Sequence, residues 1–141
     1  MFKLDEACFA EEFRFDRRAM REFAERQNAI VRIAENVGGQ IMGFVIVHVE
    51  RVATGWRAYV VTLDVMPECR QTGLGRRLMR EAEASILAAG VGWVQLHVFT
   101  ENVGAIRFYE RLGYERISRQ KDFYGDSGLD AFVYGKELHA L

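Results

Sequence analysis

The chain has 141 residues, of which 50% are hydrophobic and 28% are charged, and its formal net charge is -1. This length and composition predict one soluble globular domain over residues 1–141, which we expect to be cytoplasmic. A nearly neutral chain has no bulk attraction for nucleic acid or acidic membranes, and its apolar runs are far shorter than the roughly 20 residues that span a bilayer. The two cysteines, Cys8 and Cys69, form neither a metal-ligand pair nor a disulfide framework, so we expect reduced thiols and no metal.

The N-terminal third has the pattern of a helical region. Its apolar residues Phe9, Phe13, Met20 and Phe23 follow helical spacing, and the pattern is interrupted at residues 14–16. We therefore expect helices before residue 29, where the first predicted strand begins.

The period then changes to that of β-strands. The segments "AIVRIAEN" (29–36) and "QIMGFVIVHVE" (40–50) are rich in β-branched residues and flank a glycine pair at 38–39, which predicts an antiparallel hairpin. A second turn at 54–55 leads to another strand, "WRAYVVTLDV" (56–65).

Two strand-to-helix units follow. In the first, the strand 56–65 leads through a glycine-containing loop to a helix whose apolar residues recur up to Gly90. In the second, "GWVQLHVF" (92–99) leads through the short connection "TEN" to "VGAIRFYERLG" (103–113). Consecutive units of this kind imply neighbouring, roughly parallel strands.

The remaining segment predicts a closing hairpin. The strands "YERISRQKDF" (114–123) and "DAFVYGKEL" (130–138) are joined by the turn-rich "YGDSG". The complete pattern predicts an α+β fold, with a mixed central sheet that has antiparallel hairpins on both sides of a parallel centre.

The stretch "MPECRQTGLGRRLM", Met66 to Met79, predicts an anion site between a strand and a helix. Glycines there expose backbone N–H groups at a helix start, and the flanking arginines add positive potential. A nucleotide P-loop is excluded, because its G-x-x-x-x-G-K-[ST] spacing and lysine are absent. A dinucleotide fold is excluded as well, because Leu78 stands where the third glycine is needed.

The same loop resembles the R/Q-x-x-G-x-G/A signature of the GNAT N-acetyltransferases, and the resemblance extends from about Leu4 to Leu138. It implies the GNAT fold, in which the parallel central strands splay apart, and acetyl-CoA as cosubstrate without a metal. The loop would hold the pyrophosphate of acetyl-CoA. The matching residues are Arg70, Gln71, Thr72, Gly73, Leu74, Gly75 and Arg76.

The resemblance also places the pantetheine arm of acetyl-CoA. In the family this arm lies between the splayed strands and bonds to main-chain groups, which points to Leu63 and Val65 here. The N–H of Val65 would donate to the thioester oxygen, where negative charge develops during attack. Asn102 matches the asparagine that contacts the arm, and a helix N-cap is the alternative and compatible role for its side chain.

Two catalytic residues are implied by the resemblance. Tyr109, in "RFYERLGY", matches the tyrosine that acts as general acid toward the coenzyme A thiolate. Ribosomal-protein N-terminal acetyltransferases have "LEV" where this chain has Leu96-His97-Val98, so His97 could replace the glutamate as general base because imidazole titrates near neutrality. Glu101 or an ordered water chain are the alternative bases, and His97 could also be a packed strand residue.

Two other features concern assembly and acceptor. The first strand of the family is missing here, so the start could be internal to a longer reading frame, or another chain could cover the edge in a homodimer. The segment 123–131 resembles the turn that helps protein N-terminal acetyltransferases hold their substrate, and Tyr124 is its candidate residue. We therefore expect a protein N-terminal α-amine as acceptor. A small-molecule amine acetyltransferase and a non-catalytic coenzyme A-binding sensor are the alternatives.

Overall fold

The computed structural model of the protein describes residues 21, 25–125 and 128–139. The residues of the helical pattern predicted before the first strand lie, apart from residue 21, outside the described residues. The prediction that the first strand of the family is missing also concerns residues outside the described part of the chain. Within the described part of the chain, no helix is long and apolar enough to cross a membrane.

The described chain forms one six-stranded mixed sheet with the order β1-β2-β3-β4-β6-β5. Only β3 and β4 are parallel, and the other neighbours are antiparallel, so the predicted parallel centre between two hairpins is confirmed. The elements are β1 (Ala29–Glu35), β2 (Ile41–Val52), β3 (Gly55–Val65), the short 3-10 helix η2 (Pro67–Cys69), α3 (Leu74–Ala88), β4 (Trp93–Phe99), α4 (Val103–Arg111), β5 (Glu115–Gln120) and β6 (Ala131–Glu137).

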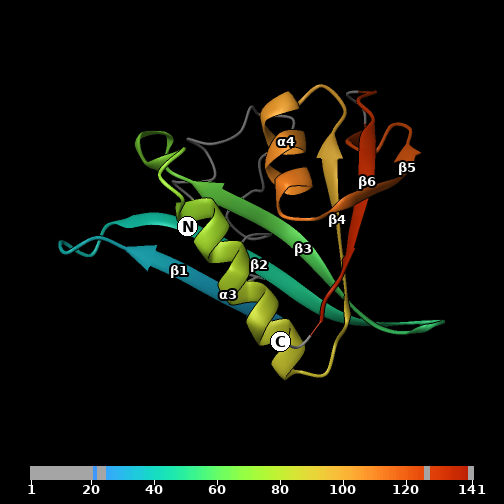
Figure 1. The fold of residues 1–141 in the computed structure, drawn as a ribbon, viewed down its shortest axis with the longest axis horizontal. Coiled ribbons are helices and arrows are strands. Elements are labelled where there is room, and N and C mark those ends of the chain that lie inside the picture. Colours follow the sequence, from blue (N-terminus) through green and yellow to red (C-terminus); the bar gives the residue numbers. More distant parts are fainter. Residues whose placement is uncertain (1–20, 22–24, 126–127, 140–141) are drawn as a thin grey trace.

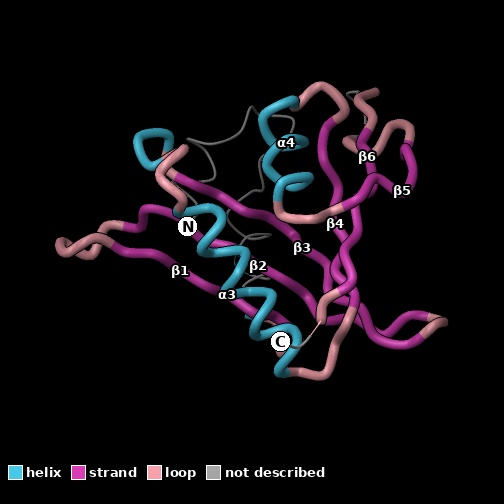
Figure 2. Tube along the Cα trace, viewed as in Figure 1, coloured by secondary structure: helices cyan, strands magenta, loops and turns pink. Residues whose placement is uncertain are grey.

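Both helices pack against the same face of the sheet. Figures 1 and 2 show α3 lying across β1, β2 and β3, while α4 stands beside β4. On β4 the residues Val94, Leu96 and Val98 are buried in this helix-covered core. Because successive side chains of a strand point to opposite faces, the residues between them, including His97, face the other side of the sheet.

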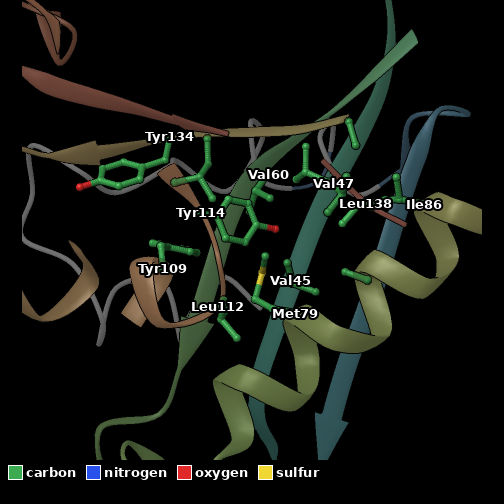
Figure 3. Packing of buried hydrophobic residues seen from close by; sticks show 14 of the residues in the cluster. Val45, Val47, Val60, Met79, Ile86, Tyr109, Leu112, Tyr114, Tyr134 and Leu138 are labelled. Carbon is green, nitrogen blue, oxygen red and sulfur yellow. The ribbon is translucent and has the colours of Figure 1, made fainter. Parts of the chain in front are cut away.

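The core joins the two helices to the central strands through aliphatic and aromatic side chains (Figure 3). In that view the side chains of Met79 and Ile86 on α3, and of Tyr109 and Leu112 at α4, extend towards the sheet. Burial of one large apolar side chain contributes about 1.5–3 kcal/mol, so this cluster holds both helices to the strands that surround the site. Its strand residues labelled in Figure 3 include Val45, Val47, Val60 and Tyr134.

A buried polar cluster fastens α3 to β6 and to the end of α4. Glu83 on α3 is only 6% exposed. Its carboxylate accepts a hydrogen bond from the Tyr114 hydroxyl at 2.8 Å and pairs with the Lys136 ammonium at 3.0 Å. Since the buried charge has a cationic and a hydroxyl partner, its desolvation is compensated locally.

The predicted helix limits agree closely with the structure. α3 ends at Ala88, just before Gly90, whose φ of 82° is accessible to glycine at little cost. Asn102 caps α4, because its side-chain oxygen accepts the Ala105 N–H at 3.1 Å, which confirms the N-cap interpretation.

Candidate active site

The two parallel strands separate shortly after they meet. β3 and β4 pair only at Ala58 with Val94 and at Tyr59 with Gln95, whereas β4 pairs with β6 along its whole length. β3 meanwhile continues to Val65 beside β2. The expected splay of the central strands is therefore present, and it opens the sheet beyond Tyr59 (Figure 1).

A bulge in β3 sets which side chains face this opening. Val47 of β2 lies opposite Val60, but its neighbour Ile46 lies opposite Thr62, so Val61 is an extra residue in β3. Beyond the bulge, Leu63 and Val65 pack against the helix-covered core. These are the two positions at which the pantetheine arm is expected, and that role stays a prediction.

The glycine loop follows β3 and ends at the first turn of α3. Gly73 is the residue before the helix, with a φ of 89°, and no side chain caps the first N–H groups of α3. A Cβ atom at Gly73 would meet nothing within 4 Å, so the approach to these N–H groups is open. Exposed donors at a helix N-terminus favour an anion.

The side chains of the loop fix its path and its charge. Arg70 donates from Nε to the Val65 carbonyl at 3.2 Å, and the Thr72 hydroxyl donates to the Cys69 carbonyl. Gln71 has a φ of 61°, a left-handed conformation in the tightest part of the loop. The arginines of this helix start are exposed and supply positive potential at the open donors: Arg70, Arg76 and Arg77.

At Gly75 the small size of glycine matters, and not an open approach for an anion. Its Cβ would lie 3.3 Å from the Phe108 ring and 3.5 Å from Val65, so its small size lets α3 approach α4. Leu74, beside it, packs against the hydrophobic core. The loop therefore combines an open position, Gly73, with a packing position, Gly75.

His97 stands between two polar partners and one aromatic ring. Its Nδ1 lies 2.7 Å from the Tyr59 hydroxyl, and its Nε2 lies 2.9 Å from the side-chain oxygen of Gln120. The Phe123 ring stacks on the imidazole at 3.9 Å between centroids with 7° between planes. Thus three elements hold His97: β3, β5 and the turn after β5.

The environment keeps both members of the Tyr59–His97 pair neutral. Burial lowers the pKa of His97, and Arg57 lowers it further, against a raising effect of the bond to Gln120. Burial also raises the pKa of Tyr59 to about 12, with smaller contributions from Tyr124 and Glu50. A neutral imidazole can accept the proton of a neighbouring neutral phenol when a substrate donates a second proton to the phenol oxygen.

Tyr109 lies on the other side of the sheet from His97, in the helix-covered core. It is buried on α4, with its ring edge-on to Phe108 at 5.1 Å and to Tyr114 at 5.7 Å. Burial raises its pKa strongly, and the neighbouring charges of Asp64 and the ionised forms of Tyr124 and Tyr59 raise it further. Tyr109 is therefore a neutral phenol at physiological pH.

Tyr124 belongs to the turn between β5 and β6. Its ring is edge-on to Phe99 at 6.1 Å and to Phe123 at 5.0 Å, and burial raises its pKa to about 12. Its main-chain N–H donates to the Leu129 carbonyl at 3.3 Å across the turn, of which residues 126–127 lie outside the described chain.

The structure thus surrounds His97 with two residues that the sequence reasoning missed, Tyr59 and Gln120, and places Tyr124 in the neighbouring turn, while Tyr109 lies in the helix-covered core. Alternation along a strand could have assigned Tyr59 to a face, but only the pairing of β3 with β4, in which Tyr59 lies opposite Gln95, brings its hydroxyl to His97. Glu101, the alternative base, is exposed. Among the described residues, no group of three acidic, histidine or cysteine side chains could hold a metal ion.

Comparison with known proteins identifies the family. The model of the acetyltransferase (GNAT) family matches residues 1–114. The chain is 34% identical over 101 residues to the catalytic subunit NAA20 of the N-terminal acetyltransferase B complex of Arabidopsis thaliana, covering 70% of this chain and 58% of that protein. It is 30% identical over 117 residues to N-alpha-acetyltransferase RimI of Mycobacterium tuberculosis, covering 83% of this chain and 71% of that protein.

A solved structure supports the same relationship. Naa20 of Chaetomium thermophilum, in complex with a bisubstrate analogue, superposes with a TM-score of 0.81 at 28% identity, covering 96% of this chain and 81% of that chain. The chain spans less than two thirds of the length of the Arabidopsis NAA20 that it matches. The sheet opening, the glycine loop before α3 and the family match agree, and the chain belongs to the GNAT family of acetyltransferases, which use acetyl-CoA.

Proposed function

We propose that this chain transfers the acetyl group of acetyl-CoA to the α-amine of a protein N-terminus. The observation that carries the proposal is the Tyr59–His97 pair, which lies where the central strands separate and next to the turn of Tyr124. The similar proteins are named as N-terminal acetyltransferases, which supports the choice of acceptor.

The loop before α3 fits the phosphate groups of acetyl-CoA. Its open N–H groups and exposed arginines offer hydrogen-bond donors and positive charge together. In the proposal, residues 70–76 hold the pyrophosphate, while Leu63, Val65 and Asn102 contact the pantetheine arm. The thioester supplies the acetyl group and the leaving thiolate.

On the acceptor side, Tyr59 and His97 act as a proton relay. As the amine nitrogen forms its bond to the acetyl carbon, it gains positive charge and releases a proton readily. That proton passes to the Tyr59 oxygen while the Tyr59 proton passes to Nδ1 of His97, 2.7 Å away. Relays of this kind are general base catalysis, which contributes about 10²–10⁴-fold to rate.

On the donor side, Tyr109 acts as the general acid. When the carbon–sulfur bond breaks, the departing thiolate takes the proton of the Tyr109 hydroxyl. A phenol whose pKa is raised by burial is fully protonated at neutral pH, so the proton is present when it is needed. Base and acid work from opposite faces of the sheet, and they meet at the opening between β3 and β4.

The chemistry of the relay favours an α-amine over a lysine. With reference pKa values of about 7.7–8.0 and 10.4, roughly one α-amine in seven is neutral at pH 7, against well under one lysine in a thousand. Only the neutral amine attacks. His97 is a weak base because burial lowers its pKa, so it suits an acceptor that is already partly deprotonated.

Two matched peptides test this acceptor. One has a free N-terminus and no lysine, and the other has a blocked N-terminus and one lysine; coenzyme A release is measured for both. We expect faster acetylation of the free N-terminus. Faster acetylation of the blocked lysine peptide refutes the acceptor assignment, and turnover only with polyamines or aminoglycosides points to a small-molecule acetyltransferase. Tight acetyl-CoA binding without any turnover points to a sensor.

A further inference from the structure

We propose that Gln120 is a positioning residue that fixes which nitrogen of His97 carries the proton, and so gives the Tyr59–His97 relay its direction. This inference rests on the proposed function only for its kinetic consequence. The tautomer itself is a property of the chain and can be measured without a substrate.

The argument begins with the partners of the imidazole. Gln120 presents its side-chain oxygen to Nε2 at 2.9 Å, and an amide oxygen only accepts hydrogen bonds. Nε2 must therefore carry the proton of the neutral ring. Nδ1 is then an acceptor, so the Tyr59 hydroxyl at 2.7 Å donates to it.

The alternative tautomer would stop the relay. With the proton on Nδ1, the ring would donate to the Tyr59 oxygen, and the Tyr59 proton would point away from His97. Nδ1 could then not accept a proton from Tyr59. The orientation of the Gln120 amide group, at the edge of the sheet, thus decides whether the half-buried Tyr59–His97 pair can take up a proton.

Gln120 is itself held in place. It is the last residue of β5 and lies opposite Ala131 of β6. On one side of it, Arg119 donates two hydrogen bonds to a single oxygen of Asp130, at 2.7 and 2.9 Å. On the other side, the Asp122 N–H donates to the second Asp130 oxygen at 3.0 Å. Arg119 and Asp122, one on each side of Gln120 in the chain, are therefore both bonded to the carboxylate of Asp130.

The imidazole cannot easily turn to escape this partner. The Phe123 ring stacks on the face of the imidazole, and His97 lies opposite Val133 in the pairing of β4 with β6. The turn that begins after Gln120 also includes Tyr124, the candidate acceptor-binding residue. One hairpin therefore supplies the acceptor contact and sets the proton of the base.

Among the residues that the structure describes, few titrating groups surround the ring. From β3, Tyr59 contacts Nδ1, and Arg57 acts on the ring while it is ion-paired with Glu50 of β2 at 3.3 Å. From the turn, Tyr124 lies beyond Phe123. On β6 the register partner of His97 is Val133, which does not titrate.

The test uses three substitutions at Gln120 with distinct hydrogen-bonding capacity. Gln120→Glu keeps an acceptor and adds negative charge. Gln120→Leu has no polar group, and Gln120→Lys offers only donors. Gln40→Leu, in the turn between β1 and β2 where Gln40 bonds to Asn36, is the matched control for losing a glutamine side chain.

The first readout is the ¹⁵N NMR spectrum of the His97 side chain, measured without substrate at a pH above its titration. We expect the Nε2–H form in the unmodified chain, in Gln40→Leu and in Gln120→Glu. We expect a mixture of tautomers in Gln120→Leu and the Nδ1–H form in Gln120→Lys. An Nδ1–H ring in the unmodified chain, or the same tautomer in all variants, overturns the proposal.

The second readout is kinetic, with the peptide that has a free N-terminus. Gln120→Leu and Gln120→Lys should lower kcat by 10-fold or more, up to the roughly 10²–10⁴-fold that a general base contributes, with an unchanged KM for acetyl-CoA. Gln120→Glu should retain kcat at high pH and move the acidic limb of the pH profile upward, because a carboxylate stabilises the imidazolium. Equal kcat in all four proteins overturns the proposal. If no amine is acetylated but the tautomers change as expected, the proposed function fails and the positioning role of Gln120 stands.

Discussion

Replacing Gly135 of β6 by alanine should destabilise the fold through one steric conflict. Gly135 is buried, and both the Trp93 ring of β4 and the side chain of Ile117 on β5 lie over it. A Cβ atom there would lie 2.2 Å from the Trp93 ring and 2.6 Å from Ile117. Carbon atoms pack at roughly 3.5–4.0 Å, so the rigid indole must withdraw by more than about 1 Å.

The expected magnitude follows from what this withdrawal breaks. Overpacking of a buried site costs about 1–3 kcal/mol, and the Trp93 N–H, which donates to Gln95 at 3.2 Å, would lose a bond worth about 0.5–1.5 kcal/mol. We therefore expect Gly135→Ala to lower the free energy of unfolding by about 2–4 kcal/mol. At roughly 4 °C per kcal/mol for a chain of this size, Tm should fall by about 10 °C.

Urea unfolding in two backgrounds measures the conflict. Gly135→Ala is made in the unmodified chain and in Trp93→Leu, which removes the ring; the cost should fall below about 1 kcal/mol in the second background, as expected for directly contacting residues. Gly92→Ala is the matched control, because its Cβ would meet only the Leu138 carbonyl at 4.0 Å. A cost for Gly135→Ala that is within 0.5 kcal/mol of zero, or equal in both backgrounds, contradicts the steric argument.

Four other predictions concern the site. Gly73→Val should abolish the rise in Tm that acetyl-CoA causes, because a branched residue disfavours the φ of 89° that opens the α3 N-terminus; an unchanged rise in a folded variant contradicts the loop assignment. Tyr109→Phe should bind acetyl-CoA normally and lower kcat by about 10²-fold or more, and an unchanged kcat would leave Tyr109 a packing residue. Tyr59→Phe and His97→Gln should each lower kcat, and the double variant should be no slower than the worse single variant, because both residues serve one relay; additive losses contradict the relay. The pKa of His97 is lower in the folded chain than its reference value of about 6.5, so the unfolded chain binds more protons and stability should fall as pH drops below that value; His97→Gln should show a smaller fall in unfolding titrations, and an equal fall would assign it to other groups.

Local patterns in the sequence predicted most of the fold. Strand 29–36, the helix after the glycine loop and the cap at Asn102 depend on neighbouring residues, and the structure confirms each within a few residues. The mixed sheet with a parallel centre followed from the order of the elements. The insertion of β6 between β4 and β5 did not, because strand order is set by contacts between distant segments.

The same limit applies to the candidate site. The loop residues and Tyr109 stand in recognisable motifs, whereas Tyr59 and Gln120 contact His97 from strands far apart in sequence. Their meeting depends on the register of three strand pairs, and a shift of one residue would turn each side chain to the opposite face. The sequence identified His97 as a candidate base without specifying its partners.

The extra residue Val61 restricts how β3 can vary in length over evolution. It lets Tyr59 face the side of the sheet that carries His97 while Leu63 and Val65 face the helices, although strict alternation would put all three on one side. A regular strand that ran through Val61 without the bulge would instead bring Tyr59 and Leu63 into the same phase. Insertions in relatives should therefore gather in the hairpin tip near 53–54, where strand phase is unaffected, and be rare between 59 and 65.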